Sequence, residues 1–202
     1  NGVATLTLSN LPVGNQTVFA VWAGDTNFVA PPAVSTSVNI TKVGTSTVLS
    51  SSANPSNPGT SVALRADVTA SNGSTPTGSV RFVNADTGAI LGTASVNAPG
   101  RAVLNVTFQT GTYNIRAEYL GNANLSASNG TLTQVSAWSA RATLTTSMNP
   151  SMPGTQVTLT ATVAKAPGVP ASVATPAGSI EFYNDSVSTT TPAFTAVLNP
   201  SG

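Results

Sequence analysis

The chain has 202 residues, and only 6% of them are charged: 7 basic and 6 acidic side chains leave a formal net charge of +1. This balance offers no basic surface to nucleic acid, and no run of 18 apolar residues occurs, so we expect neither nucleic-acid binding nor membrane insertion. Without His or Cys, imidazole and thiolate catalysis, disulfides and the common zinc sites are excluded, so we expect a structural protein without cofactors and not an enzyme.

Residues 1–44 contain one predicted strand and two predicted turns. Residues 4–8 alternate apolar and polar side chains, which is typical of a strand with one buried face. Pro and Gly mark a turn at 11–14, and Gly, Asp and Asn mark a corner at 22–28. The sequence does not begin with the basic segment of a secretion signal, so we expect any such signal to lie outside this sequence or to have been removed.

The middle of the chain contains three clear strand patterns, at 61–69, 101–108 and 112–119. Each alternates apolar and polar side chains with a period of two; in the first, Leu64 and Arg65 lie on opposite faces. No stretch of 10 residues has the amphipathic pattern of a helix. Turn-forming residues separate the strands, at 54–59, 71–74, 86–88 and 121–122. We therefore predict an all-β fold, a sandwich of short antiparallel strands.

The sequence also repeats itself. Residues 47–62 return as 142–157 at an offset of 95, and residues 75–82 return as 175–182 at an offset of 100. An insertion of five residues within 165–174 explains the change of offset. A fixed repeat of this kind indicates an array of similar domains.

The beginning of the chain repeats the later part of the same unit. Residues 4–8 correspond to 102–106, and residues 22–28 correspond to 119–125. We therefore predict the C-terminal part of one domain, a complete domain and the N-terminal part of a third, over residues 1–44, 45–138 and 139–202, with linkers near 40–44 and 137–141.

These motifs resemble the bacterial Ig-like domain family of the Big_3 type, which occurs as tandem repeats in large prokaryotic surface proteins. The resemblance rests on the turn at 54–59, the strand at 76–82, the strand and turn within 4–14 and the corner at 22–28. It implies a Greek-key sandwich of about seven strands in a secreted or cell-surface protein. It implies no catalytic residue, because the family has none to transfer.

The two ends of the sequence are complementary within this repeat. Residues 198–202 match 96–100, which lead directly into the next strand of the complete domain, and a join between the termini would make a credible hairpin turn. We therefore hypothesise that 139–202 of one copy and 1–44 of the adjoining copy form one sandwich, within a longer repetitive chain or between separate subunits. Either contact is head-to-tail and builds filaments unless it closes into a ring. The alternative is that these boundaries are unrelated to the domains.

An apolar pair in the first part is a candidate assembly interface. Phe19 and Val21 occupy the outward positions that Arg116 and Glu118 hold in the complete domain. Exposed apolar pairs of this kind can mark an interaction surface. The alternative is that a neighbouring loop or linker covers them.

Seven Asn-x-Ser/Thr sequons are candidate N-glycosylation sites. Glycans would solvate a surface that has few charges. The alternative is chance, because Ser, Thr and Asn account for 73 of the 202 residues. The candidate residues are Asn15, Asn39, Asn72, Asn105, Asn124, Asn129 and Asn184.

Other candidate sites have simpler structural interpretations. Asp25 and Asn122 lie in corresponding turns with at most one carboxylate, whereas calcium needs several, so we expect turn roles and no metal site. Trp22 and Tyr119 fall on the inward register of matching strands, which favours core anchors over carbohydrate-stacking platforms. Trp138 is expected to pack at a domain junction.

The function that these features favour is structural. We expect a repeat unit of an extracellular or cell-surface filament, stalk or adhesin, whose main partners are copies of itself. One alternative is a binding module whose loops recognise a surface glycan or a host protein. Others are a spacer in a larger secreted enzyme and part of a phage fibre.

Overall fold

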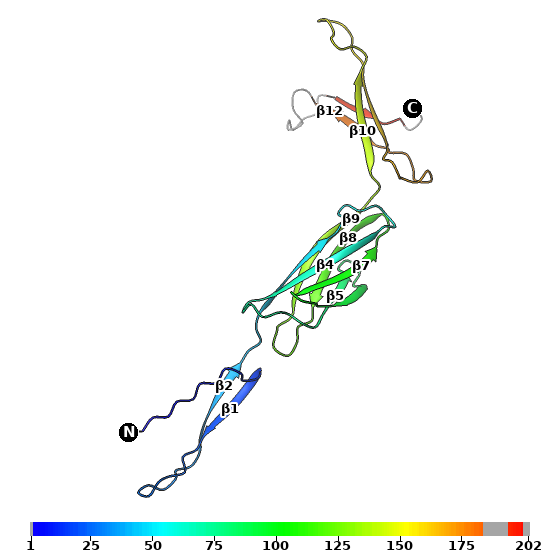
Figure 1. Ribbon diagram of the computed structural model, residues 1–202. Coiled ribbons are helices and arrows are strands. Elements are labelled where there is room, and N and C mark those ends of the chain that lie inside the picture. Colours follow the sequence, from blue (N-terminus) through cyan, green and yellow to red (C-terminus); the bar gives the residue numbers. More distant parts are fainter. Residues whose placement is uncertain (1, 184–193, 200–202) are drawn as a thin grey trace.

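The structure, a computed structural model, describes residues 2–183 and 194–199. Over these residues the regular secondary structure consists of β-strands alone, which confirms the predicted all-β class. Figure 1 shows three parts in succession along an elongated molecule: an N-terminal hairpin, a central sandwich and a C-terminal part of two strand pairs. No helix able to cross a membrane occurs in the described ranges.

The central sandwich contains seven antiparallel strands in two sheets. Their bounds are β3 (Thr45–Ser51), β4 (Ser61–Ala70), β5 (Ser79–Asn84), β6 (Ile90–Ser95), β7 (Arg101–Thr107), β8 (Gly111–Tyr119) and β9 (Ser128–Ser136). One sheet has the order β3-β4-β7 and the other has the order β6-β5-β8-β9. Because β7 crosses over to pair with β4 and not with β6, the connection has the Greek-key form that the family resemblance implies.

The core of the sandwich follows the alternation read from the sequence. Buried and outward positions alternate along β4 and β8, as expected for strands with one face on the core. Tyr119 and Phe82 are the largest fully buried side chains. The two sheets bury their inner faces together, through Val62, Leu64, Ala66, Val68, Val80, Phe82, Ala102, Ile115, Ala117 and Tyr119.

The turn at 54–59 is fastened to strand β9. The side-chain amide of Asn54 donates to the carbonyl of Thr133 at 2.7 Å, and its Oδ1 accepts from the backbone N–H of Val135 at 2.9 Å. Next to it, the backbone N–H of Ser56 donates to the carbonyl of Val135 at 3.0 Å. The turn thus closes one end of the sandwich by satisfying backbone groups at the end of β9.

The N-terminal part is a two-stranded hairpin with an extended segment beside it. Strand β1 (Gly14–Ala20) pairs with β2 (Val34–Ile40). The predicted strand at 4–8 is wrong for the single chain, because residues 2–8 are extended but join no sheet. The repeat explains the difference: β7, which corresponds to 4–8, pairs with β4, and the counterpart of β4 lies far along the chain.

The C-terminal part consists of two separate strand pairs within the described residues. Strand β10 (Ala140–Thr146) pairs with β11 (Leu159–Lys165), and β12 (Ser179–Phe182) pairs with β13 (Phe194–Val197). By the sequence repeat these four strands correspond to β3, β4, β5 and β6 in the same order. The N–H of Leu198 donates to the carbonyl of Gly178, as Val96 does to Gly78 in the central sandwich.

Candidate assembly surfaces

The two end parts expose side chains whose counterparts are buried in the central sandwich. Leu144 and Leu159 are 61% and 52% exposed, whereas Leu49 and Leu64 at the corresponding positions are 7% and 0% exposed. A sandwich sheet needs a second sheet over its inner face, and each end part offers only some of the strands. The apolar faces of the end parts therefore remain open to solvent in the single chain.

The two aromatic residues predicted to anchor cores behave differently. Tyr119 is 1% exposed and donates its hydroxyl to the carbonyl of Thr77 at 2.7 Å, so its core role is confirmed. Trp22 is 48% exposed, and the expected core role is wrong for the single chain. The reason is that no second sheet packs over β1 in the described residues. Trp138, at the junction of two parts, is half-buried.

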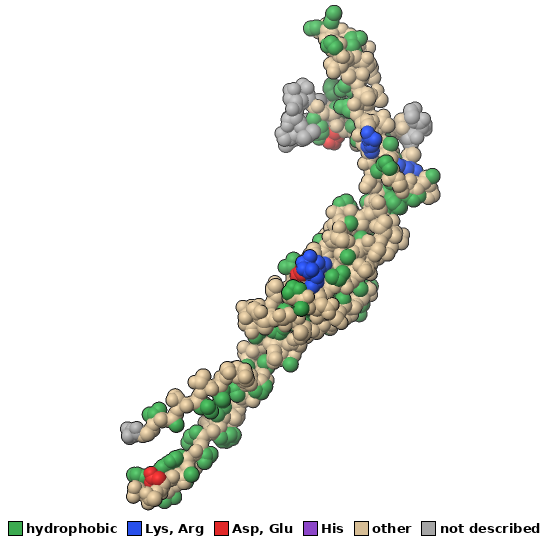
Figure 2. All heavy atoms as spheres, in the orientation of Figure 1, with side chains coloured by type: hydrophobic (Ala, Val, Ile, Leu, Met, Phe, Trp, Pro, Cys, Tyr) green, Lys and Arg blue, Asp and Glu red, His purple; other side chains and the backbone are tan. Residues whose placement is uncertain are grey.

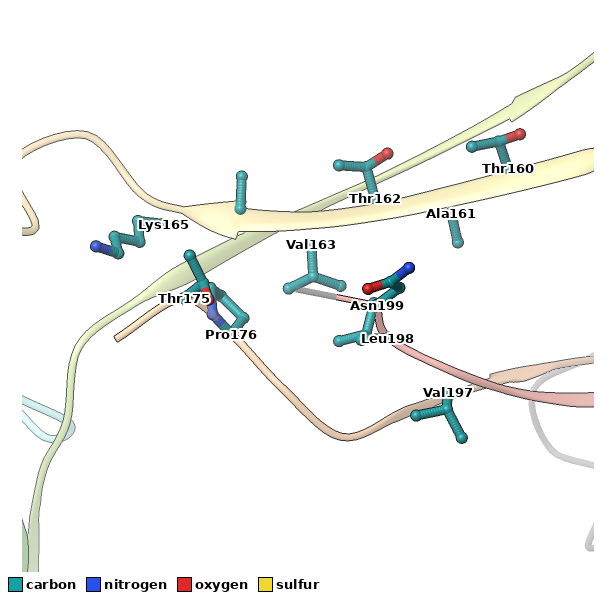
Figure 3. Close-up of a pocket in the computed structure, with 11 residues that line it drawn as sticks. Thr160, Ala161, Thr162, Val163, Lys165, Thr175, Pro176, Val197, Leu198 and Asn199 are labelled. Atoms are coloured by element: carbon teal, nitrogen blue, oxygen red, sulfur yellow. The ribbon is translucent and has the colours of Figure 1, made fainter. Parts of the chain in front are cut away.

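A groove runs along β11 in the C-terminal part (Figure 3). We call it the acceptor groove; it encloses about 580 Å³ and is lined by residues 160–165, Thr175, Pro176 and Val197–Asn199. Val163 and Leu198 face into it, whereas Thr160 and Thr162 point away on the opposite side of β11. The groove is therefore mainly apolar within, with Lys165 as the one charged side chain among its lining residues.

In the central sandwich the corresponding space is filled by the start of β7. The N–H of Val68 donates to the carbonyl of Gly100 at 2.7 Å, and Asn97 and Arg101 exchange two backbone bonds of 2.8 Å. The backbone passes so closely that a Cβ on Gly100 would lie 2.3 Å from the carbonyl oxygen of Val68. With φ at +116°, this position also favours glycine.

Strands in both end parts leave one edge open. In the described ranges β11 pairs only with β10, and β12 only with β13. Their central counterparts β4 and β5 have neighbours on both sides. At the other end, β1 pairs only with β2, whereas β8 lies between β5 and β9. Such edges expose rows of backbone donors and acceptors that can pair with another chain.

Of the predicted interface residues, Phe19 lies in β1 and Val21 follows its last residue. Both side chains are exposed, at 66% and 75%. Figure 2 shows mostly hydrophobic and uncharged side chains along this hairpin, with an acidic group at its tip, and charged side chains over both the central sandwich and the C-terminal part. The role of Phe19 and Val21 in assembly stays a prediction.

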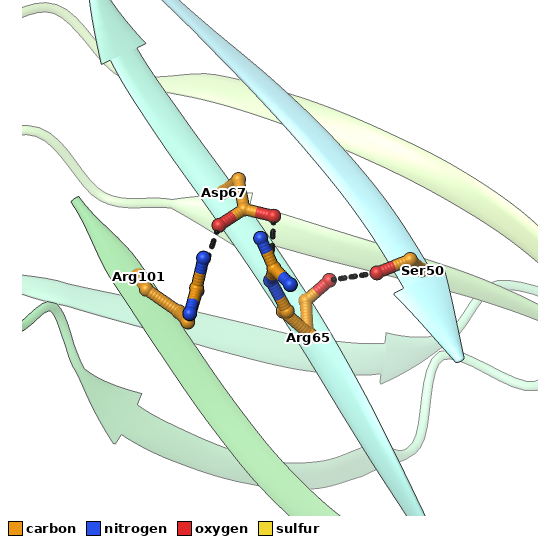
Figure 4. Close-up of polar contacts among 4 residues, drawn as sticks. All are labelled: Ser50, Arg65, Asp67 and Arg101. Carbon is orange, nitrogen blue, oxygen red and sulfur yellow. Dashed lines mark hydrogen bonds and ion pairs between the residues drawn. The ribbon is translucent and has the colours of Figure 1, made fainter. Parts of the chain in front are cut away.

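Most of the charged side chains of the central sandwich form two small clusters on its outer faces. In one, Arg65 and Arg101 contact the two carboxylate oxygens of Asp67 at 2.7 and 3.0 Å (Figure 4). Partial burial alone would raise the pKa of Asp67, but the hydrogen bonds and charges of the two guanidinium groups outweigh it and lower that pKa. The end parts have Thr160, Thr162 and Val3 at the matching positions, so no such cluster can form there.

The second cluster joins β5 and β8. Arg81 donates to one oxygen of Glu118 at 2.8 Å, and Arg116 donates to the other at 2.8 Å. The bond from Arg81 is the largest cause that lowers the pKa of Glu118. Both clusters are partly exposed and link neighbouring strands of the sandwich.

The sequons that can be located are accessible. Six of the seven candidates are exposed, and Asn15 and Asn39 lie opposite each other on β1 and β2. Asn184 lies outside the described residues. Glycosylation stays a prediction, and the exposed residues are Asn15, Asn39, Asn72, Asn105, Asn124 and Asn129.

The corresponding turns at Asp25 and Asn122 have the expected role. Each side-chain oxygen accepts two backbone N–H groups, Asp25 at 2.7 and 2.8 Å and Asn122 at 2.9 and 2.8 Å. These bonds hold the two turns in the same conformation. No group of acidic side chains suited to a metal ion occurs in the part of the chain that the structure describes.

Two features of these surfaces were not predicted from the sequence. The fastening of Asn54 to β9 is one, although the repeated Asn-Pro-Ser at 54–56 and 149–151 was a visible signal. The acceptor groove is the other. It could not be predicted from a local sequence pattern, because it is lined by segments that are far apart in the sequence.

Comparison with known proteins agrees with this architecture. Residues 49–137, which span most of the central sandwich, match the family model described as bacterial Ig-like domain (group 3). No curated protein matches the sequence. Domains of this family are typically non-enzymatic and are usually present in surface or extracellular proteins. The central sandwich of this chain therefore belongs to the bacterial Ig-like domains of group 3.

Proposed function

We propose that this chain is a structural repeat unit of an extracellular or cell-surface filament, stalk or adhesin, which assembles head-to-tail by completing Ig-like sandwiches. One observation carries the proposal: the two end parts hold complementary sets of strands, each with its apolar face and one backbone edge open. By the repeat, the C-terminal part supplies the counterparts of β3 to β6, and the N-terminal part supplies those of β7 to β9. Together they make one set of seven strands.

The elongated shape favours contact between copies over contact within one copy. The two end parts lie on opposite sides of the central sandwich in Figure 1, so one chain in this conformation cannot bring them together. A contact between unlike ends of identical copies repeats indefinitely and produces a fibre. The load along such a fibre would pass through β-sheet hydrogen bonds at each joint and through the central sandwich between joints.

The full 202-residue chain tests this directly. Light scattering across a dilution series, followed by electron microscopy, should reveal concentration-dependent growth into unbranched fibres that are one molecule wide. A chain that remains monomeric at high concentration would overturn the proposal. Amorphous clumps without axial order would also count against it, because open apolar faces alone can aggregate without a specific joint.

A second candidate is recognition of a glycan or another protein by the N-terminal part. Trp22, Asp25 and Phe28 line an open cavity of about 660 Å³ beside residues 2–4, and exposed aromatic rings suit stacking on sugars. Assembly would cover Trp22, so the two functions compete for one surface. A glycan array probed with the chain before and after assembly separates them: binding that persists in the assembled chain favours recognition by another surface.

A further inference from the structure

We propose that residues 2–8, here called the donor segment, enter the acceptor groove of a second copy of this chain and pair with its β11 in the register of β7 on β4. Strand β1 of the same donor then pairs with β12 of the acceptor copy. This inference rests on the proposed head-to-tail assembly and specifies its joint. The donor segment is extended and joined to no sheet, and its sequence has the pattern of the strand that fills the corresponding space in the central sandwich.

The register follows from the central pairing. Leu64 lies opposite Leu104, Arg65 opposite Val103 and Ala66 opposite Ala102. Carried through the repeat, these pairs become Leu159 with Leu6, Thr160 with Thr5, and Ala161 with Ala4. Leu6 is 76% exposed in the single chain, whereas its counterpart Leu104 packs against the core.

The backbone of β11 offers hydrogen bonds to the donor segment. The N–H of Ser147 donates to the carbonyl of Thr158, and that of Ala166 to the carbonyl of Ser139, so even-numbered positions of β11 are bonded to β10. Ala161 and Val163 alternate with these positions, and their N–H and C=O groups face the open edge. In the central sandwich Val68, the counterpart of Val163, uses its N–H to bond Gly100. Gly2 is the matching donor residue and brings no side chain into this close approach.

Pairing of β1 with β12 would place residues of β12 and its end opposite the exposed side chains of Phe19 and Val21. In the central sandwich Arg81 lies opposite Glu118, and Val83 lies opposite Arg116. The corresponding pairs are Glu181 with Val21, and Tyr183 with Phe19. An aromatic pair on the outer face would thus replace the central ion cluster, and cross-strand aromatic pairs stabilise sheets. Inside, Trp22 would lie opposite Ile180 where Tyr119 lies opposite Val80.

The packing of the central sandwich cannot be reproduced at every position of the proposed joint. The inference is therefore limited to the donor segment on β11 and to β1 on β12. A Cβ on Gly130 would lie 2.5 Å from the carbonyl oxygen of Thr47, and the residue that corresponds to Gly130 in the N-terminal part is Val34. Strand β2 must therefore stand further from β10 than β9 stands from β3. Phe194 takes the place of Gly92, so the tip of Leu6 must shift relative to that of Leu104.

Engineered cysteines test the register, and the absence of native Cys removes any background. Thr5 and Thr160 would be an outward pair without mutual backbone bonds, and such pairs have Cα atoms about 4.5 Å apart, within the range of a disulfide. A Thr5→Cys chain labelled with ¹⁵N is mixed with an unlabelled Thr160→Cys chain, assembled and oxidised with oxidised glutathione. Mass spectrometry of the denatured products should identify a dimer of one labelled and one unlabelled chain as the main cross-linked species.

The matched control replaces Thr160→Cys by Ala161→Cys, which places the thiol on the opposite face of β11 and should cut the yield of mixed dimer by about tenfold or more. Thr158→Cys and Thr162→Cys sample registers shifted by two residues. Assembly without the cross-link from Thr5 to position 160, or with a stronger one to position 158, 161 or 162, overturns the register but leaves the proposed function standing. Absence of assembly by light scattering overturns both.

Discussion

At the scale of the residue, Asp67 is the centre of one of the few ion-pair clusters in this chain. One carboxylate receives two guanidinium groups, one from its own strand and one from β7. Arg101 is the first residue of β7, so the cluster links β4 to β7 on the outer face of the sheet. The end parts have no counterpart of this cluster, and β11 presents hydroxyl groups there instead.

Acid should therefore weaken the central sandwich through Asp67. Its pKa is lower in the folded state, so its contribution to stability is present above the unfolded pKa of about 3.9 and disappears as the pH falls through the folded value. Because these groups are partly exposed, we expect protonation of Asp67 to lower the free energy of unfolding by only about 0.5–1 kcal/mol. Urea unfolding at about pH 7 and about pH 2, compared between the parent chain and Asp67→Asn, measures it. An equal pH dependence in both chains would contradict the role of Asp67.

Gly130 is a second position where one residue decides the packing. The close approach of β9 to the backbone of β3 leaves no room for a Cβ. Gly130→Ala should lower the free energy of unfolding of the central sandwich by about 1–3 kcal/mol, because backbone must move to admit the methyl group. Gly44→Ala is the control, since its Cβ would make only an ordinary contact of 3.8 Å. Similar unfolding curves for the two variants would contradict this account of the interface.

At the scale of the element, the same strand pattern has different outcomes in different parts of the chain. Residues 101–107 become β7 because β4 lies within reach, whereas residues 4–8 with the same alternation remain unpaired. Strand pairing is the main stabilisation of such a segment, and local propensity alone is too weak to keep it in a sheet. In the proposed joint, the unpaired donor segment of one copy would pair with the open edge of β11 in another copy.

Two neighbouring substitutions separate the faces of the donor segment. Ala4→Asp would place a carboxylate where Ala102 is fully buried, so we expect assembly to require at least about a tenfold higher concentration. Val3→Asp adds the same charge at the outward position of Arg101 and should change that concentration by about twofold or less. Light scattering of both variants gives the comparison, and equal effects would argue against an inserted strand.

At the scale of the whole molecule, a complete sandwich lies between two parts whose apolar side chains are largely exposed in this structure. The surfaces that the proposed joint would bring together are mostly apolar or hydroxyl-bearing, and their charged side chains are Lys165 at the groove and Glu181, which accepts a hydrogen bond from Tyr183 at 2.7 Å. The chain has a net charge of only +1, so long-range repulsion between copies is small. If copies assemble as proposed, the main cost of adding each copy is therefore the loss of translational and rotational freedom on association.

This arrangement predicts that assembly depends little on salt. Screening weakens exposed ion pairs strongly between about 0.05 M and 0.5 M salt, but backbone pairing and apolar burial are not weakened in this way. The concentration at which the 202-residue chain assembles should change by less than about threefold over this range. A decrease in assembly of tenfold or more at the higher salt would identify an ionic joint instead.

The sequence by itself determined the all-β class, the alternation of β4, β7 and β8, the buried role of Tyr119 and the resemblance to bacterial Ig-like domains, because these depend on local periodicity and on motifs that repeat. Only the tertiary structure decided that residues 4–8 stay outside any sheet, that Trp22 is half-exposed and that a groove opens along β11. The physical reason is that a strand is completed by a partner that local sequence cannot specify, so the same pattern can be buried in one part of a chain and exposed in another.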